Sequence, residues 1–565
     1  MLLSKRALLL VVLSVMSSIV AVFAGEIDAP YAEELWKATF EQDIQWQQMM
    51  DCGYLLVGTD DALYCLNPAD GTITWQKAEF GRLPQDHLDV IAGTPFAAIM
   101  DYERKTDSKS RMLFINIPDG RELWNSEKFG MTEANGQLFI PELEALFIVG
   151  KNAEKEYLTA LVNLFTGDAY WTSTELFDSR KSSKGPAMFD VERSTRKVIN
   201  GNQVPLVAPD GNLLEFISPQ GLRKLDAKTG AVLWTWPLKV KEVPTLKAGW
   251  APIMFSADSS TVYVPFEETL QAVNIADGTL RWGKKGVNTK GQVKEMNLRP
   301  EGIVIKGHGR ATGKTAYDEP YLKPFINALS YETGASLWRK PFKKLFNASQ
   351  MTIDGDRILV HIHGGSYYGE LQSINIADGS YGEVIRKTRF NGGEFPQRVE
   401  ALADGYLMTS ASNIARYDSE GNELWHYYYK PLAPHLLSAI AGTALIILEN
   451  NISEAQAMDE ARRTAWLNRR SFNPDTVQYE TTALNENWRL STSKSTLNYL
   501  FIATNVEGGK SSSKENAGLV KISKETGLIV SRVTLGNKEP QFEIDALESR
   551  IFFKSADSEI TCFKL

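Results

Sequence analysis

A spacing of four residues between a glycine and a tryptophan recurs along this chain and constrains its fold more than any other feature. Seven of the 13 tryptophans follow a glycine at this spacing, whereas 42 glycines in 565 residues would give about one such pair by chance. The pairs are Gly71/Trp75, Gly120/Trp124, Gly167/Trp171, Gly230/Trp234, Gly278/Trp282, Gly334/Trp338 and Gly421/Trp425. Self-similarity of this kind is typical of a repeat architecture.

Each repeat unit predicts short antiparallel strands. Asp-Gly or Thr-Gly, as in residues 225–234, supplies the positive φ that a tight hairpin needs. The residues before the turn alternate between apolar and polar, as in a half-buried strand. With a second hairpin upstream, such as residues 54–64, each unit offers about four strands. The sequence therefore predicts an all-β protein, a β-propeller of four-stranded blades.

The number of blades is less clear than their type. Two units lack the tryptophan and have Glu383 or Ser531 in its place, and residues 473–478 resemble one further worn copy. Ten or eleven units are therefore read, whereas propellers usually have about 4–8 blades. Three explanations are possible. The chain forms one large ring with eight or more blades, it forms two rings, or some blades have been counted twice.

The two ends of the chain complement each other. Residues 34–40 have the pattern of the fourth strand of a unit, but the hairpin strand that should precede it is absent. Residues 550–565 have the pattern of the second and third strands of a unit, and no fourth strand follows them. We expect the N-terminal strand to complete the C-terminal blade and close a single ring, which would remove exposed sheet edges.

The motif Leu-Asp-Ala-Lys-Thr-Gly-Ala-Val-Leu-Trp at 225–234 resembles the tryptophan-docking repeat of the PQQ-like (quinoprotein alcohol dehydrogenase-like) β-propellers. The resemblance extends over nearly all of residues 25–565. It implies that tryptophans dock between blades at Trp36, Trp75, Trp124, Trp171, Trp234, Trp282, Trp338 and Trp425. That family includes quinone-dependent dehydrogenases, the propeller lipoprotein of the barrel-assembly machinery, and binding proteins without catalysis. The repeat therefore indicates a fold more than a function.

Residues 1–24 have the pattern of a signal peptide. Lys5 and Arg6 precede an apolar run over 7–20, and small residues follow at a cleavage position. An uncleaved anchor is the alternative. We expect residues 25–565 to be exported, periplasmic or secreted, with no transmembrane segment. A helical segment is expected as an insertion near 451–470.

The residues that support catalysis in quinoproteins have no counterpart here. The dehydrogenases carry adjacent cysteines, whereas this chain has Cys52, Cys65 and Cys562, and no haem-attachment motif or calcium loop is visible. We therefore predict a non-dehydrogenase member with no catalytic residue and no cofactor. Cys65 and Cys562 occupy equivalent repeat positions and are expected to be small packing residues. Cys52 precedes a predicted strand and Cys65 lies on the antiparallel strand beside it, so a disulfide between these two is the alternative.

The longest loops fall on one predicted face, which is the expected working surface. His361 and His363 alternate on one strand, and His308 lies at the same end of the preceding blade. Three imidazoles could hold a metal, but no carboxylate is fixed nearby, so we expect a polar patch without a metal. The candidate ligand-face residues are His308, Arg310, Lys314, Tyr317, His361, His363, Tyr367 and Tyr368.

These patterns favour a non-catalytic exported propeller that binds a protein or an envelope component through its loop-rich face. The formal charge of -8 disfavours nucleic-acid binding. One alternative is a redox enzyme with a quinone or metal in the central funnel. Another is an outer-membrane assembly-type scaffold. The oligomeric state stays open.

Overall fold

The computed structural model describes most of the chain after its first 28 residues. The described ranges are 29–50, 52–91, 94–102, 110–140, 143–174, 206–217, 221–237, 253–266, 268–309, 324–343, 347–363, 368–396, 398–410, 413–429, 499–507, 515–537, 540–545 and 548–565. The predicted signal peptide and the predicted helix at 451–470 lie outside these ranges.

The described residues form ten antiparallel sheets, which belong to two compact units. The first unit holds the six sheets between Thr39 and Pro341. Its strands are β2 (Ile44–Met49), β3 (Leu55–Thr59), β4 (Leu63–Leu66) and β5 (Ile73–Lys77); β6 (Leu88–Val90), β7 (Phe96–Tyr102), β8 (Ser110–Asn116) and β9 (Glu122–Asn125); β10 (Glu133–Ile140), β11 (Ala145–Lys151), β12 (Tyr157–Asn163) and β13 (Ala169–Ser173); β14 (Leu206–Val207), β15 (Leu213–Ile217), β16 (Gly221–Leu225) and β17 (Val232–Trp236); β18 (Met254–Phe255), β19 (Thr261–Phe266), β20 (Thr269–Asn274) and β21 (Val287–Asn288); and β22 (Gly291–Arg299), β23 (Gly302–Gly309) and β24 (Pro324–Leu329).

The second unit holds the four sheets that follow Phe342, together with the residues up to Ala38. Its strands are β25 (Asn347–Ala348), β26 (Thr352–Asp354), β27 (Arg357–His363), β28 (Gly369–Asn375) and β29 (Tyr381–Thr388); β30 (Arg398–Leu402), β31 (Gly405–Thr409), β32 (Asn413–Asp418) and β33 (Glu423–Tyr428); β34 (Tyr499–Asn505), β35 (Ala517–Ser523) and β36 (Ile529–Thr534); and β37 (Phe542–Asp545), β38 (Arg550–Ala556), β39 (Glu559–Lys564) and β1 (Glu33–Thr39).

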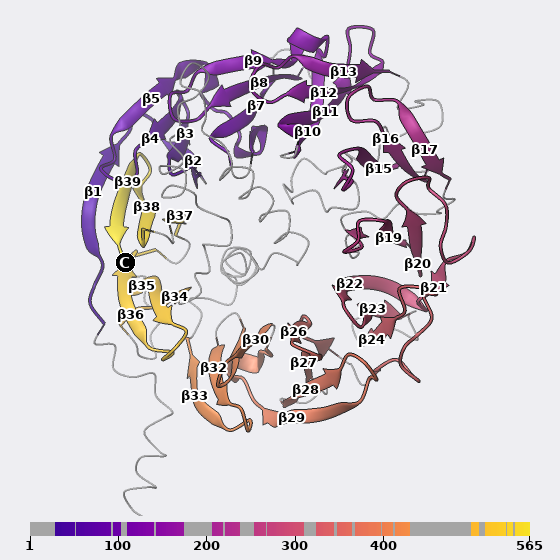
Figure 1. The fold of residues 1–565 in the computed structure, drawn as a ribbon. Coiled ribbons are helices and arrows are strands. Elements are labelled where there is room, and N and C mark those ends of the chain that lie inside the picture. The colour runs from indigo at the N-terminus through magenta and orange to yellow at the C-terminus, as the bar shows by residue number, and fades with distance from the viewer. Residues whose placement is uncertain are drawn as a thin grey trace, which may run out of the picture. The chain divides into compact units, whose positions relative to one another are not determined.

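In eight of the ten described sheets consecutive strands pair in a meander, as Figure 1 shows. The exceptions are the sheet that β1 completes and the sheet in which β25 and β26 both pair with β27. The middle strands carry continuous apolar runs, and β3 and β4 are buried at every position. The apolar residues of one sheet pack against those of the next, and one core cluster combines Leu56 and Cys65 with Leu88 and Ile115. These sheets are the blades of a β-propeller, so the predicted fold class is confirmed, with ten blades in the described residues.

The turn before the last strand of a blade has one recurring geometry. In the first blade the Gly71 amide donates a hydrogen bond to the Asn67 carbonyl at 2.9 Å. The Asn67 amide donates to the Thr72 carbonyl, also at 2.9 Å. Gly71 has a φ of 76°, in the left-handed region that glycine adopts without a steric penalty. Gly230 repeats this turn with a φ of 71°. The Asp-Gly and Thr-Gly pairs therefore form the hairpins that the sequence predicts.

The predicted pairing of the chain ends is also confirmed. The sheet order is β1-β39-β38-β37, so the N-terminal strand completes the blade that ends at Leu565. Before β1, the chain adds to a second blade. A parallel bridge joins Tyr31 to Arg532 of β36, and the Ala32 amide donates to the Arg532 carbonyl at 2.7 Å.

The helical segments in the described ranges are short 3-10 turns: η2 (Ala78–Phe80), η3 (Gln85–His87), η4 (Ser126–Phe129) and η8 (Asn391–Gly393). No helix in that part of the chain is long and apolar enough to span a bilayer.

Candidate functional site

The predicted docking tryptophans of the first unit contact the turn of the following blade. Trp124, on β9, is 4% exposed, and its indole Nε1 donates to the Leu164 carbonyl at 2.9 Å. Its ring lies against Gly167, where an added Cβ would be 2.5 Å from Trp124 Cγ. Gly167 therefore has two constraints, a φ of 68° and a tryptophan ring in the space of its side chain. We call this arrangement the Trp–Gly contact.

The Trp–Gly contact occurs between all five pairs of consecutive blades in the described first unit. In each pair the indole donates to the carbonyl three residues before the turn glycine, which keeps the polar end of the ring satisfied. The donor–acceptor pairs are Trp75–Ile117, Trp124–Leu164, Trp171–Ala227, Trp234–Ile275 and Trp282–Tyr331, at 2.5–3.1 Å. Trp124 and Trp171 are buried, whereas Trp75, Trp234 and Trp282 are partly buried.

The second unit joins its blades in other ways. Glu383 replaces the tryptophan on β29, and the turn glycine of the next blade, Gly421, packs directly on Val384 and Ile385. The following pair keeps a tryptophan, Trp425, whose ring faces Gly527. Backbone packing therefore replaces one Trp–Gly contact.

Lysine side chains provide two further links in the second unit, one of them at the junction that Trp425 also joins. Lys524 pairs with Glu400 at 3.1 Å, which joins the β34–β36 sheet to the β30–β33 sheet. Lys521 lies opposite Ser531, the residue at the tryptophan position. Its Nζ donates to Ser549 Oγ at 2.8 Å and approaches the Leu565 carbonyl at 3.4 Å. A buried cation thus replaces the indole donor.

The other two predicted docking tryptophans lie elsewhere. Trp36, on β1, is partly buried, and its ring is 5.8 Å from Phe552 of its own blade. Trp338 is buried and follows the last sheet of the first unit. Its carbonyl accepts a hydrogen bond from Ser336 Oγ at 2.8 Å.

His361 is fixed inside its blade. It lies on β27, is 1% exposed, and its Nε2 is 2.6 Å from Thr388 Oγ1. The ring occupies the space over Gly369, where a side chain would collide with it. Burial, followed by the neighbouring His363, lowers the pKa of His361 to about 4. The residue is therefore a neutral imidazole at physiological pH.

His363 shares this side of β27 and is also buried. Its ring stacks on Phe395, with the ring centroids 3.3 Å apart. Burial lowers its pKa, and its Nδ1 is buried without a hydrogen-bond partner. The expectation that these histidines line a polar patch on the loop-rich face is wrong for His361 and His363, because both rings are buried, one against Thr388 and the other against Phe395.

Tyr368 is the member of the predicted ligand face that lies at the surface. It is 39% exposed, and Lys387 Nζ lies 3.9 Å from its ring centroid. The Arg389 guanidinium lies 5.8 Å from the same ring. Tyr368 therefore helps to hold two cations at one end of β29. Arg310, Lys314, Tyr317 and Tyr367, the other surface candidates, lie outside the described residues.

His308 lies one residue before the end of β23 in the first unit, whereas His361 and His363 belong to the second. Burial lowers the pKa of His308, and the nearby Lys294 and Lys306 lower it further. Lys306 is itself paired with Glu295 across the β22–β23 ladder. In the described part of the chain, no three histidine, cysteine or carboxylate side chains are grouped as a metal site would require.

The disulfide considered for Cys52 and Cys65 is not formed. Both are buried thiols, as is Cys562. Cys65 on β4 pairs with Leu56 and Trp75, and Cys52 lies in the turn before β3, so the register does not place the two cysteines opposite each other. Burial raises the pKa of Cys65 to about 12. It is therefore a packing residue rather than a nucleophile.

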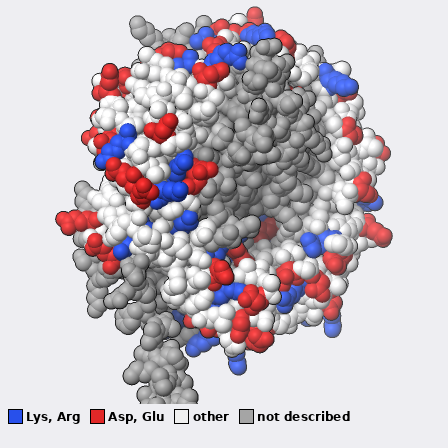
Figure 2. Space-filling view, turned by 60° about the vertical axis from the view of Figure 1, so that its left-hand side comes forward, with Lys and Arg blue, Asp and Glu red and all other residues white. Residues whose placement is uncertain are grey.

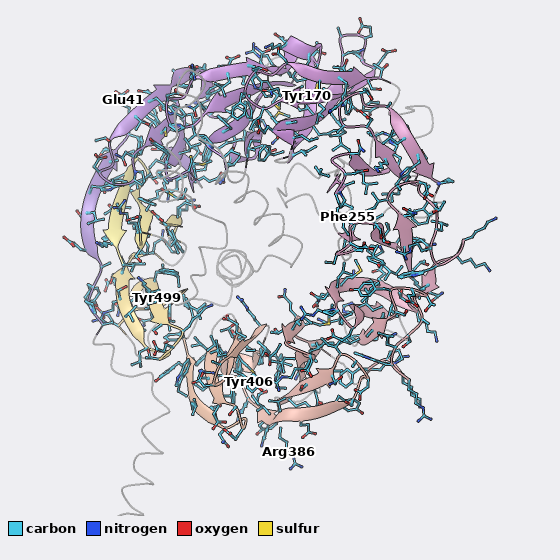
Figure 3. All side chains as sticks on the ribbon, viewed as in Figure 1. Glu41, Tyr170, Phe255, Arg386, Tyr406 and Tyr499 are labelled. Atoms are coloured by element: carbon cyan, nitrogen blue, oxygen red, sulfur yellow. The ribbon has the colours of Figure 1, made fainter. Side chains whose placement is uncertain are left out.

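The sequence reasoning missed the cations at the end of β29. Arg386, Lys387 and Arg389 form a short basic run that is visible in the sequence. All three are exposed, and Arg386 projects away from the ribbon in Figure 3. No local signal predicts the enclosure of the histidines by Thr388 and Phe395.

Residues 24–216 match the sequence model of the family described as outer membrane protein assembly factor BamB (PQQ_2). The match starts at the end of the predicted signal peptide and ends in β15, within the fourth sheet of the first unit. None of the curated proteins matches the chain.

Several solved structures resemble the chain at low similarity. BamB from Moraxella catarrhalis is 12% identical with a TM-score of 0.30, covering 69% of this chain and 95% of that one. The quinohemoprotein alcohol dehydrogenase from Comamonas testosteroni is 11% identical with a TM-score of 0.29, covering 68% and 72%. A eukaryotic initiation factor is 9% identical with a TM-score of 0.37, covering 71% and 90%. Likenesses this distant carry no functional argument.

Proposed function

We propose, from the premise that this chain is a PQQ-like repeat propeller with a BamB-type segment over residues 24–216, that it is a non-catalytic scaffold of the cell envelope. The proposed scaffold is exported through residues 1–24 and binds a protein partner. Its task would be of the outer-membrane assembly type, as the name of the matched family describes. The family match is the single observation that carries this proposal.

The construction of the first unit supports a scaffold. Five Trp–Gly contacts of one geometry join consecutive blades, each with a satisfied indole donor. A rigid repeat with variable loops suits binding, because the framework fixes where each loop lies. The long loops of the predicted binding face, among them residues 103–109 and 310–323, lie outside the described residues.

The residues present do not fit the quinone site that the family's dehydrogenases are expected to carry. The chain has no two cysteines adjacent in sequence, and its three cysteines are free, buried thiols, of which Cys52 and Cys65 share one core cluster. Cys65 and Cys562 lie in blade interiors, where burial raises the pKa of each to about 12. We therefore propose a chain that works without a resident quinone or metal.

Two measurements on the source cells test this proposal. The tagged full-length chain should appear in the envelope fraction with an N-terminus at Gly25, and Leu9→Arg/Leu10→Arg should block export. Chemical cross-linking followed by mass spectrometry should recover components of outer-membrane protein assembly. Retention of residues 1–24 in the cytoplasm would refute export.

The enzyme alternative predicts a different result. A redox enzyme would purify with stoichiometric quinone or metal and would oxidise alcohols with an artificial electron acceptor. Absorption spectra and metal analysis of the full-length protein decide between the two. Stoichiometric cofactor with dye-linked activity would replace the scaffold proposal.

A further inference from the structure

The edge strand β29 differs from the other described edge strands in its charge. Arg386, Lys387 and Arg389 are exposed within four residues. In comparison, β5 carries one lysine, Lys77, which pairs with Glu79 at 3.3 Å. Among the described residues, no carboxylate forms an ion pair with the three cations of β29. We call these three residues the β29 cations.

Two bulges gather the β29 cations. The register with β28 shifts between the pairs Gly369/Thr388 and Leu371/Ile385, and again at the next pair. Arg386 and Lys387 therefore lie together opposite a single residue of β28, Glu370, whose carboxylate accepts a hydrogen bond from Gln372 at 2.8 Å. A bulge of this kind re-aims the side chains it carries. Figure 2 shows acidic and basic side chains side by side over the face that it draws.

The backbone edge of β29 is the second element of the surface. In the described residues β29 pairs with β28 alone, so its other edge has no strand partner. Tyr381, at the start of the strand, is 49% exposed. An edge of this length offers backbone donors and acceptors to an added strand, and strand addition is a general mode of peptide recognition.

The second unit already uses strand addition at the equivalent edge of another blade. Residues Pro30–Ala32 lie parallel to β36, with the Ala32 amide donating to the Arg532 carbonyl and the Arg532 amide donating to the Pro30 carbonyl at 3.1 Å. The Arg532 guanidinium lies 4.1 Å from the Tyr31 ring centroid. An edge strand with a cation therefore accepts, in this fold, an extended segment that carries an aromatic ring.

We propose that the exposed edge of β29 binds an extended, acidic segment of a partner protein by strand addition, with its carboxylates against Arg386, Lys387 and Arg389. Charge complementarity selects an acidic occupant, because the cations lack carboxylate partners in the described chain. The unpaired edge selects a peptide over a nucleic acid or a lipid, since only a peptide supplies matching backbone groups. The β29 cations adjoin Tyr368 of the predicted ligand face, but the proposal concerns the strand edge and not the loops. Its failure would therefore leave the proposed scaffold function standing.

Peptide binding to the full-length protein tests the proposal. The probe is a fluorescent eight-residue peptide in which Glu alternates with Val and Thr, followed by fluorescence anisotropy. We expect the acidic peptide to bind, its Gln counterpart to bind more weakly, and added salt to weaken binding. A peptide that keeps every Glu but is N-methylated on alternate amides should also bind more weakly, because it cannot complete the strand ladder.

Matched variants locate the binding surface. Arg386→Gln/Lys387→Gln/Arg389→Gln should weaken binding about tenfold. Lys228→Gln/Lys284→Gln/Lys285→Gln removes the same charge from exposed lysines of the first unit and should change binding by less than about twofold. Circular dichroism and melting of both variants check that each is folded.

Several outcomes would overturn the proposal. Equal effects of the two triple variants would make the binding a general effect of charge. Full binding of the N-methylated peptide would rule out strand addition. Binding of phosphatidylglycerol vesicles through the β29 cations, with no peptide binding, would assign the surface to lipid. If no probe binds and the Arg386→Gln/Lys387→Gln/Arg389→Gln variant self-associates, the cations serve only to keep the strand edge from pairing with other copies of the chain.

Discussion

The two units of this chain solve the same packing problem with different chemistry. In the first unit, five consecutive blade pairs repeat the Trp–Gly contact with little variation. In the second unit, the same junctions use backbone packing at Gly421, a tryptophan at Gly527, and a lysine at Ser549. A repeat can therefore lose its signature residue without losing its blades, provided that another group covers the neighbouring turn.

The difference has consequences for stability. A buried or partly buried indole adds apolar burial and one satisfied hydrogen bond at each junction of the first unit. A buried lysine brings a desolvation cost with its hydrogen bonds, and burial lowers the pKa of Lys521. We expect the junctions of the first unit to tolerate fewer substitutions than those of the second unit, because each tryptophan ring occupies the space that a side chain at the turn glycine would need.

The largest effect should come from removing the strand that completes the last blade of the second unit. Deletion of residues 25–40 leaves the edge of β39 unpaired and removes the segment on β36. We expect loss of soluble folded protein or aggregation, because an unpaired edge templates association. Size-exclusion chromatography and thermal melting measure this. A truncated chain that melts at the wild-type temperature would show that β1 is dispensable.

The first unit should respond strongly to loss of a buried indole. Trp124→Ala should lower the free energy of unfolding by about 3–5 kcal/mol. Trp234→Ala should cost less, because its ring is partly exposed. Denaturant unfolding followed by amide exchange in β6–β13 checks the size and the place of the effect. Equal losses at the two positions would contradict the burial argument.

Acid should weaken the second unit through His361. The pKa of this histidine is about 4 in the fold and 6.5 without it, so between these values the unfolded chain binds a proton that the folded chain does not. Stability is therefore highest above pH 6.5 and falls by about 3 kcal/mol as the pH drops to 4. His361→Gln should flatten this pH dependence of the unfolding free energy. An unchanged profile in the variant would assign acid sensitivity to other groups.

The smallest of these effects should follow loss of the lysine that replaces an indole donor. Lys521→Met keeps the apolar stem and removes the hydrogen bond to Ser549. We expect a loss of about 1 kcal/mol, the usual net value of one hydrogen bond. Ser549→Ala is the matched partner variant, and denaturant unfolding compares the two. A gain in stability for Lys521→Met would mean that desolvation outweighs the link.

The features that the sequence predicts well are local. The turn glycines, the tryptophans and the closing strand follow from short-range patterns, because hairpin geometry needs a positive φ at one fixed position. Even the degenerate units at Glu383 and Ser531 lie on edge strands as expected.

The features that sequence reasoning missed depend on contacts between distant residues. The enclosure of His361 depends on Thr388, 27 positions away, and on a bulged register. Phe395 reaches His363 from beyond β29. The link from Lys521 to Ser549 spans two sheets. No periodic pattern encodes such pairs, so burial of the histidines could not be predicted.

The central claim is that tryptophan and glycine act as one unit at each junction of the first unit, and a double-mutant cycle at Trp124 and Gly167 tests it most directly. Gly130 is the matched control, because it has a φ of 80° and open space around it. Denaturant unfolding measures the loss of unfolding free energy in each variant. In the wild-type background Gly167→Ala should lose clearly more than Gly130→Ala. In the Trp124→Ala background Gly167→Ala and Gly130→Ala should lose equal amounts. An equal cost of Gly167→Ala in both backgrounds would show that the glycine serves the turn alone and would contradict the account.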